Sequence, residues 1–132
     1  MKIPRHLTDE IVRHALDDRP NECCGIIGGH GDRAETVYRA SNAEASPFRY
    51  SIAPSEQLQL INRIDEAGEQ LIGIYHSHTK TEPFPSETDV NLASGWPDAI
   101  WLIISLKDPE EPELRAFRIV DGEIEDVDLE IS

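Results

Sequence analysis

Apolar residues recur at helical spacing in two stretches of the chain. Residues 7–16 carry their leucine, isoleucine, valine and alanine side chains three to four positions apart, which predicts an amphipathic helix. A second helix is predicted from Pro54, a residue favoured at the first helical position, to Gly68, because apolar residues recur there at three-residue steps. A shorter helix is predicted over residues 86–94.

Strands are predicted where branched apolar residues alternate with polar ones or run continuously. These segments are residues 22–29, 36–40, 48–52, 71–78, 99–106, 113–120 and 123–129. The last two are expected to form a hairpin about Asp121-Gly122. Helices and strands mix without regular alternation, which predicts an α/β (mixed α+β) domain, with a mixed sheet flanked by helices, over residues 1–132.

Length and charge limit the function further. A chain of 132 residues, of which 39% are hydrophobic, is long enough to bury its own core as one domain. Lys and Arg number 12 against 26 for Asp and Glu, so the net charge is -14. Phosphate backbones and anionic membrane surfaces require a basic patch, so neither nucleic acid nor a membrane is an expected partner.

The same sequence predicts a cytoplasmic protein. No apolar run approaches the length needed to cross a bilayer, and residues 1–10 lack the apolar region of a signal peptide. The two cysteines, Cys23 and Cys24, are adjacent and do not form a disulfide framework. The role of these two cysteines is left open.

The chemistry concentrates between residues 75 and 89. His76 and His78 lie two apart at the end of a predicted strand, so both imidazoles are expected on one face and Ser77 on the other. Asp89 falls in the first turn of the next predicted helix, and the intervening loop can bring it to the pair. Two imidazoles and a carboxylate leave one position open on a tetrahedral Zn²⁺, which is typical of a catalytic zinc site.

Each of these features also has a simpler interpretation. A His-x-His pair on a strand is often polar surface, and Ser86-x-x-Asp89 resembles a helix capping box. Both interpretations can hold for Ser86 and Asp89, since a capped helix start is a rigid mount for a ligand. Glu22 alone would be an ordinary charged residue at a strand edge. The remaining histidines lack partner spacing and are expected on the surface or on helix faces: His6, His14 and His30.

In combination, these positions resemble the signature of the JAMM (MPN+) zinc metalloprotease family. The signature is met by His76-x-His78, seven residues, Ser86, two residues and Asp89, with Glu22 in the upstream segment PNECCG. The flanking sequences YHSHTKTE and PSETDV, together with Asn42-Ala43, are similar to a small bacterial branch whose members release cysteine from a sulfur-carrier protein.

The resemblance implies a cytidine-deaminase-like layout, Zn²⁺ held by His76, His78 and Asp89, Glu22 as the general base, and Ser86 as a donor to the oxyanion. It also implies a substrate: a small ubiquitin-like or sulfur-carrier protein whose Gly-Gly C-terminus is joined by an amide to cysteine. An isopeptidase that removes such proteins from lysine is the alternative, and a metal-free scaffold is a weaker one because every signature position is filled. The carrier's identity and the oligomeric state, including a homodimer, are left open.

Overall fold

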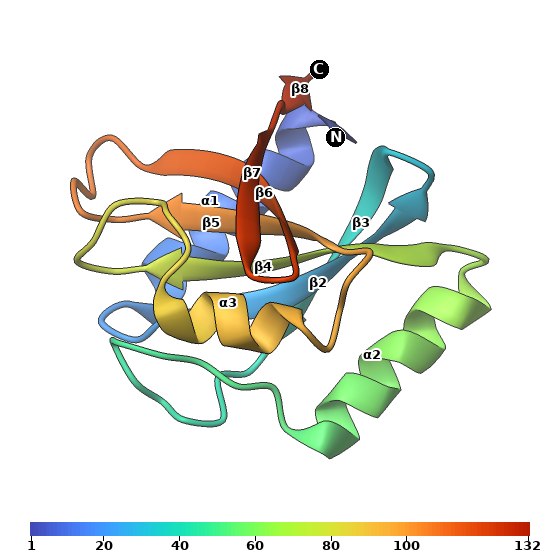
Figure 1. The fold of residues 1–132 in the computed structure, drawn as a ribbon, viewed down its shortest axis with the longest axis horizontal. Coiled ribbons are helices and arrows are strands. Elements are labelled where there is room, and N and C mark those ends of the chain that lie inside the picture. Colours follow the sequence, from blue (N-terminus) through green and yellow to red (C-terminus); the bar gives the residue numbers. More distant parts are fainter.

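One mixed sheet of eight strands runs through the computed structural model, which describes residues 1–132 (Figure 1). The elements in chain order are β1 (Lys2–Ile3), α1 (Arg5–Asp18), β2 (Cys24–His30), β3 (Arg33–Ala40), α2 (Pro54–Glu66), β4 (Gln70–His78), α3 (Glu87–Ala93), β5 (Ile100–Ser105), β6 (Glu113–Val120), β7 (Glu123–Val127) and β8 (Glu130–Ile131). The strand order is β7-β6-β5-β4-β2-β3-β1-β8. β4 pairs with β5 in parallel and with β2 antiparallel, which confirms the predicted mixed α+β class.

The sheet curls strongly. β7 and β8 stand at opposite ends of the strand order, yet only Asp128 and Leu129 separate them in the chain. So short a connection spans about 10 Å at most, so the two ends of the sheet must approach each other. A hydrogen bond from the Met1 amino group to the Asp128 carbonyl oxygen, 2.8 Å long, secures this closure.

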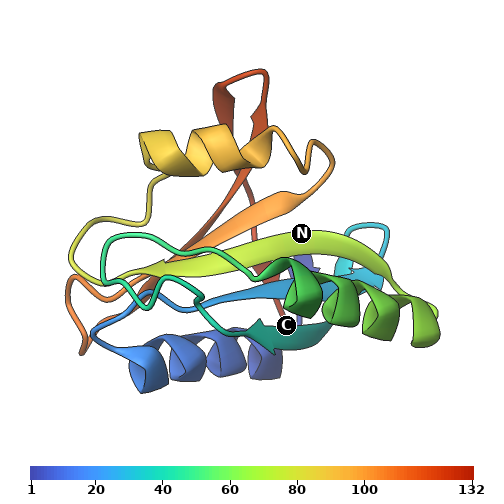
Figure 2. The ribbon, with the colours of Figure 1, turned by 90° about the horizontal axis from the view of Figure 1, so that it is seen from below.

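Helices cover both faces of the curled sheet. α1 packs on one face, and α2 and α3 lie on the other (Figure 2). Each face has its own apolar cluster of fourteen buried residues, to which α1 contributes Leu7 and Ile11, and α2 contributes Leu60 and Ile64. The helical spacing seen in the sequence therefore marks the faces that the helices bury against the sheet.

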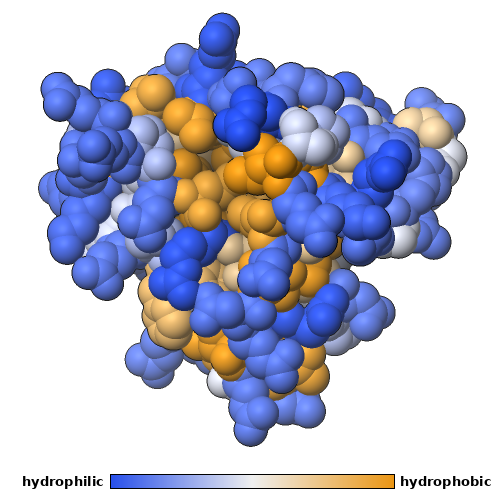
Figure 3. Space-filling view, turned by 90° about the horizontal axis from the view of Figure 1, so that it is seen from above, coloured by the Kyte–Doolittle hydropathy of each residue, from blue (hydrophilic) through white to orange (hydrophobic).

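Apolar side chains are not confined to the interior. On the side of the molecule shown in Figure 3, they gather in a hollow ringed by polar residues. None of the three helices is both long enough and apolar enough to cross a bilayer.

All predicted elements but one are present in the structure, with ends shifted by a few residues, and the two-residue strands β1 and β8 were not predicted. Residues 48–52, expected to be a strand, belong to an irregular loop between β3 and α2. The Asn42 side chain accounts for this: its amide donates to the carbonyl oxygens of Glu22 and Arg49, and its oxygen accepts from the N–H groups of Glu44 and Ser51. Side-chain hydrogen bonds replace the ladder that a strand would need.

His14 lies on a helix, as expected, but on the buried side of that helix. It lies on α1 but is only 3% exposed, and its Nδ1 is 2.7 Å from the Tyr75 hydroxyl. Its Nε2 lies 3.3 Å from Asp18, one helical turn further on. The Tyr75 ring reaches this position because Gly25, beneath it, has no side chain. His14 is therefore a buried link between α1 and β4, and its partner on the sheet is not visible in local spacing.

Candidate metal centre

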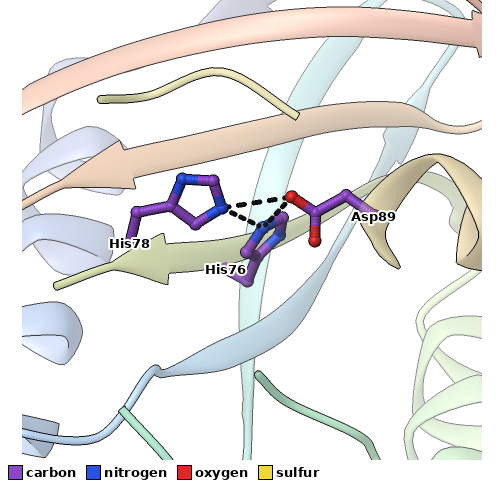
Figure 4. Close-up of side chains that lie close together, drawn as sticks. All are labelled: His76, His78 and Asp89. Atoms are coloured by element: carbon purple, nitrogen blue, oxygen red, sulfur yellow. Dashed lines mark hydrogen bonds and ion pairs between the residues drawn. The ribbon is translucent and has the colours of Figure 1, made fainter. Parts of the chain in front are cut away.

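Three potential metal ligands converge where β4 ends and α3 begins (Figure 4). His76 and His78 are at the C-terminal end of β4 and project from the same face of the sheet, as the side-chain period of two predicts. Asp89 reaches them from the first turn of α3. All three are buried, with 0%, 5% and 4% of their surfaces exposed respectively.

The spacing of the three donor atoms fits a zinc ion. His76 Nε2, His78 Nε2 and Asp89 Oδ2 are each 3.1 Å from the other two. Ligand atoms bound about 2.0–2.1 Å from Zn²⁺ at tetrahedral angles are separated by about 3.3–3.4 Å. The structure thus holds these atoms at close to the separation that shared coordination of one ion requires.

The hydrogen bonds of His78 also indicate a metal site. Its Nδ1 lies 2.9 Å from the carbonyl oxygen of Glu82, which can only accept, so Nδ1 carries the proton. In the neutral ring, Nε2 then presents a lone pair to the Asp89 carboxylate 3.1 Å away. Two lone pairs face each other unless a cation lies between them or a second proton is bound.

The two imidazoles are held in different ways. A backbone carbonyl orients His78, as is usual for metal-ligating histidines. The Nδ1 atom of His76 has no hydrogen-bond partner. Instead the Tyr50 ring stacks on His76, with centroids 4.6 Å apart and planes inclined by 24°. Tyr50 comes from the loop that Asn42 organises.

Asp89 is fixed by the start of its own helix. The Asp89 N–H donates to Ser86 Oγ over 3.1 Å, and the Ser86 N–H donates to Asp89 Oδ2 over 2.9 Å. This is the capping box that the sequence suggested as the simpler interpretation. It coexists with the convergence on the histidines, since the same carboxylate oxygen faces both rings.

Glu22 lies just before β2, which begins at Cys24 rather than at Glu22. Its side chain is on the sheet face of the imidazoles by alternation from Cys24, whose register partner on β4 is His76. Glu22 is 5% exposed, and burial raises the pKa of its carboxyl to about 8. The charge of His78 lowers this pKa and that of Asp89 raises it, so Glu22 is electrostatically part of the centre.

The three candidate ligands have shifted pKa values. Burial lowers the pKa of His76. Burial also acts to lower the pKa of His78, but hydrogen bonds with Asp89 and the Glu82 carbonyl outweigh it and raise that pKa. Burial acts to raise the pKa of Asp89, whereas hydrogen bonds from both histidines hold it well below its usual range. The hydrogen bond to Asp89 therefore favours the protonated form of His78 when no metal is bound.

The structure brings together all five residues singled out in the sequence: Glu22, His76, His78, Ser86 and Asp89. Tyr50 and Asn42 were not identified as parts of the centre. An aromatic residue in an apparent strand gives no sign of stacking on a histidine far along the chain, and Asn42 entered only as part of a family-like dipeptide.

Comparison with known proteins agrees with this geometry. The model of prokaryotic homologues of the JAB domain matches residues 4–120. The chain is 44% identical over 120 residues to the CysO-cysteine peptidase of Mycobacterium tuberculosis, covering 89% of this chain and 82% of that protein. It is 40% identical over 105 residues to a desampylase of Haloferax volcanii, covering 74% of each.

Solved structures of similar proteins share this fold. The solution structure of a protein from Desulfitobacterium hafniense superposes with a TM-score of 0.90 at 32% identity, covering 100% of this chain and 93% of that one. A structure described as JAMM, a metalloprotease-like zinc site in the proteasome and signalosome, shares the fold with a TM-score of 0.65 at 20% identity, covering 100% and 97%. The chain belongs to the prokaryotic JAB family, and it is a peptidase of the JAMM type.

Proposed function

We propose that this protein is a zinc peptidase that hydrolyses the amide between the C-terminus of a small sulfur-carrier or ubiquitin-like protein and cysteine. The observation that carries the proposal is the convergence of two imidazoles and a carboxylate at mutual distances of 3.1 Å. The 44% identity to a CysO-cysteine peptidase supports this substrate.

His76, His78 and Asp89 would hold the metal. Zinc held there supplies a Lewis acid that activates water at neutral pH. Because the chain offers three ligands, a bound zinc ion would keep one position for water or substrate.

Glu22 serves as the general base and then as the general acid. Its carboxylate takes the proton of the attacking water and returns it to the departing amine, which leaves as a free amino group. Burial raises the pKa of this carboxyl in the metal-free chain, and a zinc ion held nearby would lower it and so favour the carboxylate that accepts the proton of water.

Ser86 stabilises the oxyanion of the tetrahedral intermediate. Its Oγ accepts the N–H of Asp89, which leaves the hydroxyl hydrogen free to donate. A donor already fixed by the helix start needs no reorganisation as charge develops on the carbonyl oxygen.

The test uses the mycobacterial CysO–cysteine adduct with the zinc-loaded enzyme. We expect free cysteine and a CysO carboxyl terminus by mass spectrometry, and an activity loss of about 10²–10⁴-fold in Glu22→Gln, with zinc retained. Normal turnover by that variant would remove Glu22 from the mechanism. A zinc-loaded wild-type enzyme that cleaves neither this adduct nor a lysine-linked one would favour the scaffold role.

Specificity is expected to lie in the carrier tail. A Gly-Gly end can lie extended beside the metal, whereas a side chain next to the scissile bond would displace the carbonyl and cost about 10²-fold in rate. Changing the carrier's last Gly to Ala should therefore reduce turnover far more than changing the released Cys to Ser. Equal losses would refute this version of the proposal.

A second candidate function is an isopeptidase that removes such carriers from lysine, which the 40% identity to a desampylase favours. Faster cleavage of a carrier–lysine isopeptide than of the cysteine adduct would select it.

For either function we propose a cytoplasmic location, since Cys23 and Cys24 are buried free thiols rather than a disulfide.

A further inference from the structure

Ser77 lies between the two histidine ligands but faces away from them. It is completely buried, and its Oγ accepts a 2.7 Å hydrogen bond from the backbone N–H of Cys23. Its own backbone N–H donates to the Cys23 carbonyl oxygen over 3.1 Å. Ser77 therefore holds Cys23, the neighbour of Glu22, at both of its backbone polar groups.

This contact lies where regular strand pairing has stopped. The register of β2 with β4 ends at the pair Cys24 and His76. Cys23 precedes β2, and the Ser77 hydroxyl supplies the acceptor for its N–H. Removing the hydroxyl would leave a donor without a partner on a residue with no exposed surface, and the chain would have to shift to satisfy it.

The backbone of Glu22 also forms hydrogen bonds with the loop that follows β3. Its N–H donates to the Ser46 carbonyl oxygen over 2.9 Å. Its carbonyl oxygen accepts the Asn42 side-chain amide over 3.0 Å. The backbone of Glu22 is thus hydrogen-bonded to this loop, and its neighbour Cys23 is hydrogen-bonded to Ser77 on β4.

We propose that Ser77 is a positioning residue, which fixes the Glu22 carboxylate relative to the metal centre by binding the Cys23 backbone. This inference rests on the function proposed for Glu22. Because Ser77 shares β4 with His76 and His78, one strand sets the positions of two candidate ligands and, through two hydrogen bonds with Cys23, of the base. Misplacement of a reacting group by about 1 Å can cost 10²-fold in rate.

A purely structural role predicts a different result. A buried hydroxyl that only stabilises the fold would, when removed, lower the melting temperature and leave the turnover of the folded enzyme unchanged. Thr8 provides the matched control, because its buried hydroxyl donates to the Arg5 carbonyl oxygen on α1, on the sheet face away from the imidazoles.

The experiment compares Ser77→Ala, Ser77→Thr and Thr8→Val with wild type, all zinc-loaded, on the mycobacterial CysO–cysteine adduct. For Ser77→Ala we expect one zinc per chain, a KM within about twofold, and a kcat reduced by about 10–100-fold. Ser77→Thr keeps the hydroxyl and should recover most of the kcat, and Thr8→Val should lose stability only. If Ser77→Ala melts below the assay temperature, Ser77→Cys replaces it, since a thiol is a weak acceptor.

A double variant identifies the route of the effect. If Ser77 acts through Glu22, then Ser77→Ala should reduce the residual activity of Glu22→Gln by less than about twofold, because the group it positions is already disabled. A full additional loss in the double variant, or an unchanged kcat in Ser77→Ala, would overturn the positioning role while leaving the proposed function intact. A normal kcat in Glu22→Gln alone would instead overturn the function proposed for Glu22, and with it this inference.

Discussion

The buried carboxyl of Glu22 should make the stability of the metal-free protein depend on pH. Burial raises the pKa of this group from its ordinary value of 4.5 to about 8 in the folded chain. In the unfolded chain it is exposed to water and titrates near 4.5. Between these values, unfolding releases a proton, so the free energy of unfolding falls as pH rises. The contribution is complete below pH 4.5 and is lost by about pH 8.

The size of this effect follows from the difference between the two pKa values. Each pH unit in the window corresponds to about 1.4 kcal/mol, which gives an upper bound of about 5 kcal/mol. Entry of water into the unfilled centre reduces the cost of the charged form, and we expect about 2 kcal/mol. Glu22→Gln has no such proton to lose, so its stability should change less over the same range.

The assay is urea denaturation of both proteins in the presence of a chelator, at pH 5 and at pH 8. Groups that titrate alike in wild type and variant cancel when the two pH-dependent changes are subtracted. Wild type should lose about 2 kcal/mol more than Glu22→Gln, and zinc should shrink the difference because a nearby cation lowers the pKa of the carboxyl. Parallel changes in the two metal-free proteins would refute a buried, proton-retaining Glu22.

Three further outcomes are expected from the metal centre. His76→Ala or His78→Ala removes one of three protein ligands, so zinc affinity and activity should collapse while circular dichroism stays native; full zinc content by elemental analysis in either variant would contradict the assignment. Zinc affinity measured against a competing chelator should fall as pH drops from 8 to 6, because the raised pKa of His78 makes a proton compete with the metal. A zinc affinity that does not change between pH 8 and pH 6 would exclude this competition. Tyr50→Phe should bind zinc like wild type and Tyr50→Leu more weakly, by about 10-fold, since stacking rather than a hydrogen bond orients His76; equal affinities would show that the stacking is incidental.

The convergence of the three candidate ligands could be predicted from sequence because their geometry is local. A strand period of two places His76 and His78 on one face, and the capping box fixes where α3 begins and hence where Asp89 points. Glu22 is different: its position depends on the register between β2 and β4, which pairs Cys24 with His76. No local pattern contains that register, so only resemblance to a family identified Glu22 as part of the centre.

The wrongly predicted strand marks the limit of periodicity as a guide. Residues 48–52 alternate like a strand, but a strand also needs a neighbouring backbone to pair with, and the sequence does not say whether one is available. In the structure, Asn42 supplies both donors and acceptors to this segment and takes over the hydrogen bonding. His14 shows the same limit, since its partner Tyr75 is sixty-one positions away.

The loop in which local pattern fails is also the loop that completes the centre. It carries Tyr50 onto the His76 ring and the Ser46 carbonyl onto the Glu22 N–H. Asn42 ties both together, because its side chain bonds the Glu22 carbonyl oxygen and, further along the loop, the N–H of Ser51 beside Tyr50. A regular strand in this place would use its backbone groups in a ladder and leave none for Glu22. The irregular backbone is therefore what allows one segment to hold both His76 on β4 and Glu22 just before β2.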